Sequence, residues 1–278
     1  MSSEFFSIQI EKPQITQFVE LLLSDGALNL PRTNSYEFCR LQKDTGYIII
    51  YNTGKIVSTN ISARLFMFKH LDNLLLSTHQ LIIGSDESGK GESLGPLVVA
   101  AASVPGSLRS KLISFGVMDS KSLSLQRIGL IYNKLIHSID YETIEITPQI
   151  FNNKFKHYKQ SGKGLNHILA ESHIEVITKL LDKTKLEQTI KVVIDQFDKD
   201  KINKELAKID YNNVIFEQTI HGENELAVAS ASIIARHIRE IWIDNKSQEL
   251  GIDLRSFNIQ KNLEQIDIEK YFKVDYIK

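Results

Sequence analysis

The segment Gly84–Val99, which reads GSDESGKGESLGPLVV, constrains the fold of this chain more than any other. An apolar run at Leu81–Ile83 leads into it, and a longer run begins at Leu97 and ends at Val104. Short apolar runs bounded by glycines predict buried strands. The acids Asp86 and Glu87 then stand at the end of the first strand, and the glycines form the turn to the second. Such a turn lets a ligand approach the backbone closely.

Two kinds of site fit the same residues. Gly84, Gly89 and Lys90 match the G-x-x-x-x-G-K frame of a loop that binds phosphate through backbone N–H groups and a lysine. That kind of loop continues with a Ser or Thr that binds magnesium, and this chain has Gly91 there. The two carboxylates would also repel a triphosphate unless cations stood between them. The acidic pair therefore favours a divalent-metal site.

The composition is that of a globular protein without a strong charge. Of 278 residues, 42% are hydrophobic and 24% are charged, and the formal net charge is −1. A polyanionic partner must then be bound by metal ions or by a local basic cluster. The four lysines within Lys154–Lys163 form such a cluster, or else a solvated face. The single cysteine, Cys39, excludes an internal disulfide and predicts a buried strand residue in a reducing compartment.

The N-terminal sequence gives no sign of export. It lacks a basic start followed by an apolar stretch, and no window approaches about 18 uninterrupted apolar residues. We therefore expect a cytoplasmic protein with no membrane partner. We also expect a monomer.

The chain is predicted to fold as two domains. Residues 1–77 carry a βαβββα pattern with hairpin turns at Asp44–Gly46 and Asn52–Gly54, and 81–278 alternates strands and helices as α/β domains do. The expected strands are Phe5–Ile10, Tyr36–Gln42, Tyr47–Tyr51, Lys55–Thr59, Leu81–Asp86, Gly95–Val104, Tyr141–Thr147, Ile190–Asp195 and Asn213–Gln218. The expected helices include those that begin near Pro13, Ala63, Leu125, Leu165 and Leu226, and residues 77–80 are a plausible linker.

Asp195 ends a second continuous apolar strand, VVIDQF at Val192–Phe197. If this strand is the parallel neighbour of the one that carries Asp86, both acids emerge at the same sheet edge. Three carboxylates gathered there repel one another without cations, and Mg²⁺ prefers oxygen ligands. The chemistry that follows is phosphoryl transfer with two metal ions. From position alone, acids that cap turns or pair with lysines stay an open alternative.

Several blocks of the sequence resemble the type 2 ribonuclease H family. Gly84–Ala102 resembles its opening strand and glycine turn, Asp119–Leu123 its D-S-K-x-L segment, and Ala229–Arg236 its A-A-S-I-I-A-R helix. The blocks stand in the family order over about 150 residues. The segments Ile194–Phe197 and Tyr51–Val57 are similar to ribonuclease HIII in particular.

The resemblance implies a fold and an activity. It implies a ribonuclease H-like mixed sheet flanked by helices at 81–278, preceded at 1–77 by a small α+β domain that resembles the TATA-binding-protein fold and helps to bind substrate. From the residues alone, a dimerisation or packing module would be favoured for 1–77. The implied activity is endonucleolytic cleavage of the RNA strand of RNA–DNA hybrids with two Mg²⁺ or Mn²⁺ ions, leaving 5′-phosphate and 3′-hydroxyl ends.

Residue by residue, Asp86, Glu87 and Asp195 match the first three metal-binding carboxylates of the family. The fourth family acid stands about ten residues before the serine of A-S-I-I, where this chain has Gly222. Glu223 takes the role if the loop is one residue shorter, and Glu225 is the alternative. Asp86, Glu87, Asp195 and Glu223 are predicted to act as catalytic metal ligands.

The resemblance also implies substrate contacts. The turn Gly89-Lys90-Gly91 is similar to the G-R-G or G-K-G of the ribonuclease HII branch, whose backbone contacts ribose 2′-hydroxyls. Such contacts distinguish RNA from DNA. Lys90 and Lys121 would bind phosphates without reading sequence, and Ser120 belongs to the same substrate-binding set.

Two features leave other functions open. The displaced fourth acid and a C-terminal stretch, Arg255–Lys278, that departs from the family suggest a catalytically weak hybrid-binding protein as the alternative. A phosphate-loop nucleotide hydrolase is the third candidate, and Gly91 argues against it. Surface or packing roles are expected for His173 and His237, whereas His221 stands beside the uncertain acid.

Overall fold

The computed structural model describes residues 5–75, 81–118, 120–184, 189–195, 198–219, 222, 225–259 and 266–277. The chain divides into two compact units. The first unit comprises Met1–Gln80 and Pro105–Gly116, and the second comprises Leu81–Val104 and Val117–Lys278. The predicted linker at 77–80 lies outside the described residues.

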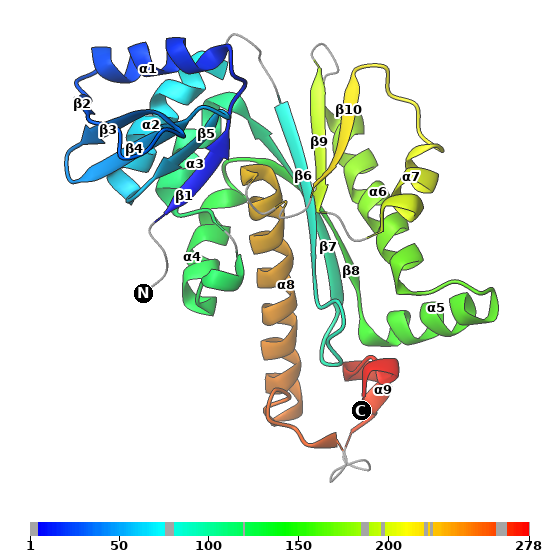
Figure 1. The fold of residues 1–278 in the computed structure, drawn as a ribbon. Coiled ribbons are helices and arrows are strands. Elements are labelled where there is room, and N and C mark those ends of the chain that lie inside the picture. The colour runs from blue at the N-terminus through cyan, green and yellow to red at the C-terminus, as the bar shows by residue number, and fades with distance from the viewer. Residues whose placement is uncertain are drawn as a thin grey trace. The chain divides into compact units, whose positions relative to one another are not determined.

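The first unit contains a five-stranded antiparallel sheet packed against helices (Figure 1). Its elements are β1 (Phe6–Gln9), α1 (Gln14–Ser24), β2 (Leu28–Leu30), β3 (Glu37–Lys43), β4 (Gly46–Tyr51), β5 (Lys55–Ser58), α2 (Ile61–Leu75) and α3 (Arg109–Phe115). The strand order is β1-β5-β4-β3-β2. The four strands and two helices predicted for residues 1–77 are confirmed, and Cys39 is buried on β3 as expected.

Two features of the first unit were not predicted. Strand β2 has three residues, too few to show an alternating pattern. The segment Pro105–Gly116 groups with this unit although the sequence placed it within 81–278, because α3 packs against α2. Helix α1 buries Ile15, Phe18 and Leu22, whose spacing places them on one helical face.

The second unit is a mixed five-stranded sheet with helices on both faces. Its elements are β6 (Leu81–Ser88), β7 (Leu97–Pro105), α4 (Leu125–Leu135), β8 (Asp140–Ile146), α5 (Pro148–Gln160), α6 (Leu165–Lys183), β9 (Ile190–Asp195), α7 (Lys199–Leu206), β10 (Val214–Thr219), α8 (Leu226–Leu250) and α9 (Ile268–Tyr271). The strand order is β10-β9-β6-β7-β8. The α/β fold class predicted for this part is confirmed.

The register of the sheet confirms the predicted neighbours. Strand β6 pairs with β9 in parallel, and the last pair in register is Ser85 with Ile194. The next residue along each strand is an acid, Asp86 and Asp195. The carboxyl ends of parallel strands meet at the same sheet edge, so the two acids emerge together there.

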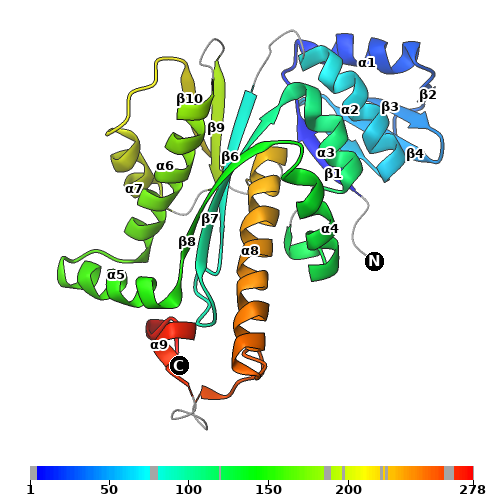
Figure 2. The same ribbon diagram turned by 180° about the vertical axis from the view of Figure 1, so that it is seen from behind.

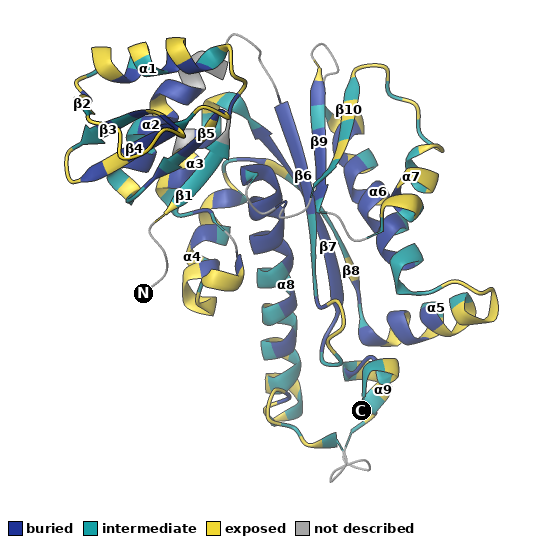
Figure 3. Ribbon diagram, viewed as in Figure 1, coloured by how far each residue is buried: buried dark blue, intermediate teal, exposed yellow. Residues whose placement is uncertain are grey.

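Helix α8 packs against one face of β6, and α6 packs against the opposite face, as Figures 1 and 2 show. A Cβ at Gly84 would lie 2.1 Å from Val228 N and 2.2 Å from Ala227 C, so the backbones of β6 and α8 approach more closely than a side chain allows. Strands β6 and β7 and the first half of α8 are largely buried (Figure 3). Glycine at position 84 is therefore explained by helix packing.

Candidate active site

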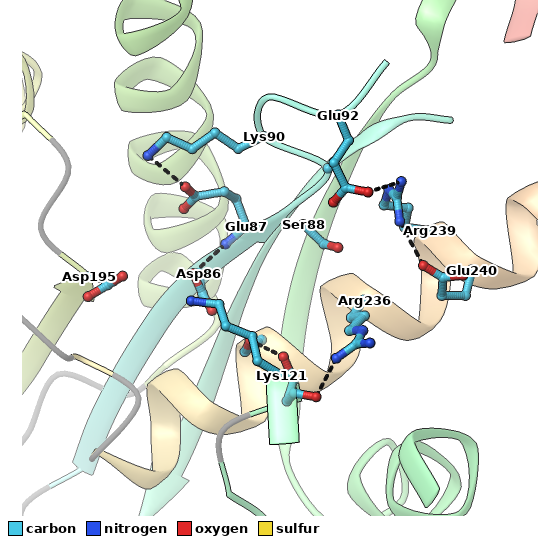
Figure 4. Close-up of a pocket in the computed structure, with 13 residues that line it drawn as sticks. Asp86, Glu87, Ser88, Lys90, Glu92, Lys121, Asp195, Arg236, Arg239 and Glu240 are labelled. Atoms are coloured by element: carbon cyan, nitrogen blue, oxygen red, sulfur yellow. Dashed lines mark hydrogen bonds and ion pairs between the residues drawn. The ribbon is translucent and has the colours of Figure 1, made fainter. Parts of the chain in front are cut away.

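A cavity of about 510 Å³ lies at the end of β6 (Figure 4). The sequence-predicted residues that line it are Asp86, Glu87, Gly89, Lys90, Ser120, Lys121 and Asp195. It is also lined by residues that the sequence did not single out for the site: Ser88, Glu92, Ser232, Arg236, Arg239 and Glu240. Gly91 is not part of this lining, as far as the described residues define it. Groups far apart in the sequence thus face one space.

The protein compensates the ionised form of Asp86 poorly. Burial and the negative charge of Glu87 raise the pKa of Asp86 to about 7, and the nearby Asp195 adds to the rise. Hydrogen bonds from Ser232 and from the backbone N–H of Glu87, at 2.8 Å, act in the opposite direction. Because nearby carboxylates raise one another's pKa, a cation among them would stabilise the ionised form.

Glu87 is in a different environment. Its Oε2 lies 3.1 Å from His173 Nε2 on α6, and its Oε1 lies 3.1 Å from Lys90 Nζ. Burial alone would raise its pKa, but the hydrogen bond and charge of His173, together with Lys90, outweigh burial and hold the pKa at about 2. Glu87 is therefore ionised at neutral pH.

Asp195 ends β9, and its Oδ1 accepts a hydrogen bond from the backbone N–H of Gly222 at 3.0 Å. A Cβ at Gly222 would lie 3.2 Å from that same Oδ1. Gly222 therefore lies beside the carboxylate edge of the sheet. This is the region where a fourth acid was expected.

The two candidates for the fourth acid differ in what the structure describes. Glu223 lies outside the described residues. Glu225 is the N-cap residue of α8, and the cavity lining that the structure describes does not include it. Its backbone N–H donates to Gly222 O at 2.8 Å, which links the start of α8 to the residue that bonds Asp195.

The three described carboxylates share one cavity without forming a closed cage. Asp86 and Glu87 are consecutive on a strand and point to opposite sides in Figure 4. Within the described residues, no three His, Cys, Asp or Glu side chains already stand together as a metal-binding group. Oxygen-rich, negatively charged and partly open, the cavity nevertheless fits a hard divalent cation that keeps some of its waters.

Two sequence blocks meet through serine side chains. Ser120 Oγ lies 2.8 Å from Ser232 Oγ on α8, and Arg236 donates to the backbone oxygen of Ser120. This places Lys121 at the cavity wall, where it points into the space between Asp86 and Arg236 in Figure 4. Asp119, the first residue of the D-S-K block, lies outside the described residues.

The two glycines of the turn, Gly89 and Gly91, lie in different surroundings. Gly89 has a φ of 91°, and a Cβ there would lie 2.3 Å from Pro96 O. Gly91 has a φ of 73° with open space around it. Gly84, in contrast, lies inside β6 and not in a loop. The phosphate-loop interpretation is wrong on this point, because its first glycine serves strand and helix packing.

The C-terminal segment Tyr271–Lys273 is hydrogen-bonded to Ser93 and Gly95, which follow the glycine turn in the chain. Lys273 is fully buried, and its Nζ donates to the backbone oxygen of Gly95. The N–H of Lys273 donates to Ser93 O at 2.7 Å, and that of Gly95 donates to Tyr271 O at 2.9 Å. The atypical C-terminus of this chain therefore reaches the back of the segment that carries the glycine turn.

Stability should rise with pH because of Lys273. Burial lowers its pKa from 10.5 to about 7, with a further contribution from the charge of Arg239. Below pH 7 the amine is charged in both the folded and the unfolded state, so the cost of burying the charge is fully present. Between pH 7 and 10.5 the unfolded chain binds more protons, so stability rises by at most about 1.4 kcal/mol per pH unit.

Lys273→Met removes the amine and keeps most of the buried volume. We expect a flatter dependence of the unfolding free energy on pH for this variant than for the native chain, measured by urea denaturation from about pH 6 to about pH 10. Equal slopes for the two proteins would contradict a neutral buried amine at position 273.

The family of the chain follows from its sequence as well as its site. A family model described as Ribonuclease HII matches residues 83–258, which is more than half of the chain. This chain belongs to the ribonuclease HII family. The matched range contains every residue that lines the cavity, whereas the buried Lys273 lies beyond it.

Curated relatives within this family are named ribonuclease HIII. One from Protochlamydia amoebophila is 34% identical over 172 residues, and one from Bacillus cereus is 35% identical over 178 residues. Each match covers 62% of this chain and 55% of the relative, so the chain matches about half the length of these proteins. The chain is therefore a type 2 ribonuclease H by family, most like ribonuclease HIII.

Solved structures show the same fold. The crystal structure of Bst-RNase HIII in complex with Mn²⁺ is similar at a TM-score of 0.63 and 23% identity, covering 98% of this chain and 95% of that chain. Ribonuclease HII in its complex with PCNA from Archaeoglobus fulgidus is similar at a TM-score of 0.52 and 26% identity, covering 68% of this chain and 92% of that chain.

Each helix in the described part of our chain is too short or too polar to cross a membrane.

His173 is the main residue of this ribonuclease HII site that the sequence did not predict. Of the surface and packing roles expected for it, the surface role is wrong, because the ring is fully buried, and the bond to Glu87 is a contact that was not expected. In the sequence, His173 interrupts an apolar face of α6. This pattern alone does not identify Glu87 as its hydrogen-bond partner. His237, in contrast, stacks on Tyr132, and His221 lies outside the described residues.

Proposed function

We propose that this chain is an endoribonuclease that hydrolyses the RNA strand of RNA–DNA hybrids. The observation that carries the proposal is that Asp86 and Asp195 each follow the last paired residue of the parallel strands β6 and β9, with Glu87 in the same cavity. A buried carboxylate with as little compensation as Asp86 has fits a divalent-cation site. Membership of the ribonuclease HII family supports the choice of substrate.

The proposed metal ligands are Asp86, Glu87, Asp195 and Glu223, which would hold two Mg²⁺ or Mn²⁺ ions. The similar Bst-RNase HIII was crystallised in complex with Mn²⁺, which supports this choice of cation. When bound, such ions supply an activated water and stabilise the leaving oxygen of a phosphodiester. The products would carry 5′-phosphate and 3′-hydroxyl ends. The protein contributes the carboxylates that hold the ions in place and the groups that hold the substrate in line.

The substrate would lie along the glycine turn. Backbone amides of Gly89 and Gly91 are proposed to reach a ribose 2′-hydroxyl. Both positions have a positive φ, which favours glycine, and glycine has no side chain to keep the ribose away. Lys90 and Lys121 would bind phosphates on either side, and Ser120 would fix the position of Lys121 through its bond to α8.

The second unit is proposed to act as the catalytic domain, and the first unit as the substrate-binding domain. One face of the sheet in the first unit is covered by α2, whereas the other presents Phe38 and Arg40 from β3 and Tyr47 from β4. Phe38 and Tyr47 are 40% and 38% exposed, and Arg40 extends from the same face. Exposed rings on a sheet suit stacking with nucleic acid, whereas the guanidinium of Arg40 is paired with the carboxylate of Glu37 at 2.6 Å.

A cleavage assay tests the proposal. The purified chain is incubated with an RNA–DNA hybrid labelled on the RNA, with a DNA duplex and with an RNA duplex of the same sequence, in Mg²⁺, in Mn²⁺ and in EDTA. We expect internal cuts in the RNA of the hybrid in either metal and none in EDTA. Hybrid binding without cuts in both metals would instead establish the weak binding protein, which the glycine at position 222 favours as the second candidate.

The fourth ligand can be decided with two variants. Glu223→Gln is expected to lower the rate of hybrid cleavage at least about 100-fold, because an amide cannot replace a ligand carboxylate and two powers of ten correspond to about 2.7 kcal/mol. Glu225→Gln, at the start of α8, should stay within about threefold of the native rate. The reverse order of effects would assign the role to Glu225.

A further inference from the structure

A line of buried polar groups connects the core of the second unit to Glu87. The Ser85 hydroxyl donates to the backbone oxygen of Ala100 at 2.8 Å, and Ser85 Oγ lies 2.7 Å from His173 Nδ1. On the other side of the ring, His173 Nε2 lies 3.1 Å from Glu87 Oε2. The line crosses from β7 through β6 to α6 and returns to the end of β6.

The polar groups of this line are unusual because they lie in the buried core. Ser85 and His173 both have an exposed fraction of 0%, and the same strand and helix supply Ile83, Ala170 and Ile177 to the buried apolar core. Polar groups in such a place are costly unless each is hydrogen-bonded, and here each has a partner. An apolar pair would fill the same space at lower cost, so the bonds themselves require an explanation.

The bonds fix the orientation of the imidazole. The single hydrogen of the Ser85 hydroxyl is given to Ala100 O, so Ser85 Oγ accepts from His173 Nδ1–H. That bond holds the ring with Nε2 toward Glu87, and Nε2–H donates to Oε2, so the ring carries a hydrogen on both nitrogens. Glu87 is thereby held by one oxygen, Oε2, and its other oxygen, Oε1, faces the cavity side where Lys90 Nζ stands at 3.1 Å.

We propose that His173 is a positioning residue for the metal site, and that Ser85 in turn orients His173. The proposal rests on the function proposed above. In this arrangement His173 keeps Oε2 of Glu87 fixed and leaves Oε1 to a divalent cation, which displaces Lys90 toward the substrate. Partners of this kind behind a ligand typically change metal affinity or activity about 10- to 100-fold when they are removed.

Mn²⁺ binding by the metal-free chain tests this without any turnover. Free Mn²⁺ is measured by electron paramagnetic resonance during titration of the native chain, His173→Leu, His173→Gln and Ser85→Ala, with thermal unfolding as a check of the fold. We expect His173→Leu to weaken binding about 10- to 100-fold. Glutamine keeps an N–H that reaches Glu87, so His173→Gln should recover at least about tenfold of the loss.

The variants separate the possible failures. Ser85→Ala keeps the imidazole of His173 but removes the bond that orients it, and should weaken Mn²⁺ binding about three- to tenfold. This variant decides the matter if His173→Leu does not fold. His237→Leu replaces a half-buried histidine outside the cavity lining and should bind Mn²⁺ as the native chain does. Native binding together with unchanged binding in folded His173→Leu, or in Ser85→Ala, overturns the positioning role. Absence of Mn²⁺ binding by the native chain would refute the proposed function itself.

Discussion

Asp86→Asn should remove RNA-strand cleavage from this chain, with a loss of at least about 1000-fold in rate. Asn presents one neutral oxygen where the ionised carboxylate would hold a cation, and three powers of ten correspond to about 4 kcal/mol of lost transition-state stabilisation. The same change removes a buried carboxyl whose pKa is raised to about 7 by burial and by Glu87. The metal-free variant should therefore be at least as stable as the native chain.

Two measurements accompany this rate. Hybrid binding in EDTA should be unchanged within about threefold, because the groups proposed to bind phosphate are intact. Asp200→Asn, which changes an exposed acid in the first turn of α7 outside the cavity lining, should cleave at the native rate. Native cleavage by Asp86→Asn would refute its role as a metal ligand. A drop in stability along with activity would reduce the result to a folding defect.

Gly84→Ala should be among the most destabilising single changes in the second unit. Its Cβ would stand 2.1 Å from Val228 N and 2.2 Å from Ala227 C, and both atoms belong to the backbone of α8. Since neither can rotate away, helix and strand must move apart across a close-packed interface. Overpacking of a core costs about 1–3 kcal/mol when side chains can adjust, so we expect at least about 3 kcal/mol here. Chemical denaturation measures it.

The position of α8 also links this change to the site. Ser232 and Arg236 lie on the same helix and line the cavity, so a shifted α8 should lower cleavage even in the folded fraction. Gly129→Ala is the matched control, because a Cβ there meets His237 Cε1 at an ordinary 3.5 Å in the middle of α4. It should be neutral or should stabilise by up to about 1 kcal/mol. A loss below about 1 kcal/mol for Gly84→Ala would contradict the close approach.

The carboxylate site was largely predictable because its geometry follows from strand patterns. Apolar runs ending in Asp86 and Asp195 predict buried strands, and parallel pairing then brings both acids to one edge. The glycine turn was predictable for a similar reason, since Gly89 requires a positive φ at a fixed place between two strands. In these cases neighbours along the chain carry the information.

Other parts depend on contacts between residues far apart in sequence. His173 and Ser85 are 88 residues apart in the sequence, and Lys273 and Gly95 are 178 residues apart. No local sequence pattern therefore predicts either hydrogen bond. The segment Pro105–Gly116 joins the first unit through packing on α2, although it follows β7 directly in the chain. Such pairings are set by the fold as a whole and become visible only in three dimensions.

The central claim is that Asp86, Glu87 and Asp195 form one divalent-cation site. Crystals grown with Mn²⁺ and measured near the manganese absorption edge test it directly. The account predicts anomalous density inside the cavity, about 2 Å from oxygens of Asp86 and of Glu87 or Asp195, with Lys90 no longer beside Glu87 Oε1. Anomalous density away from these carboxylates, or none at saturating Mn²⁺, would contradict it.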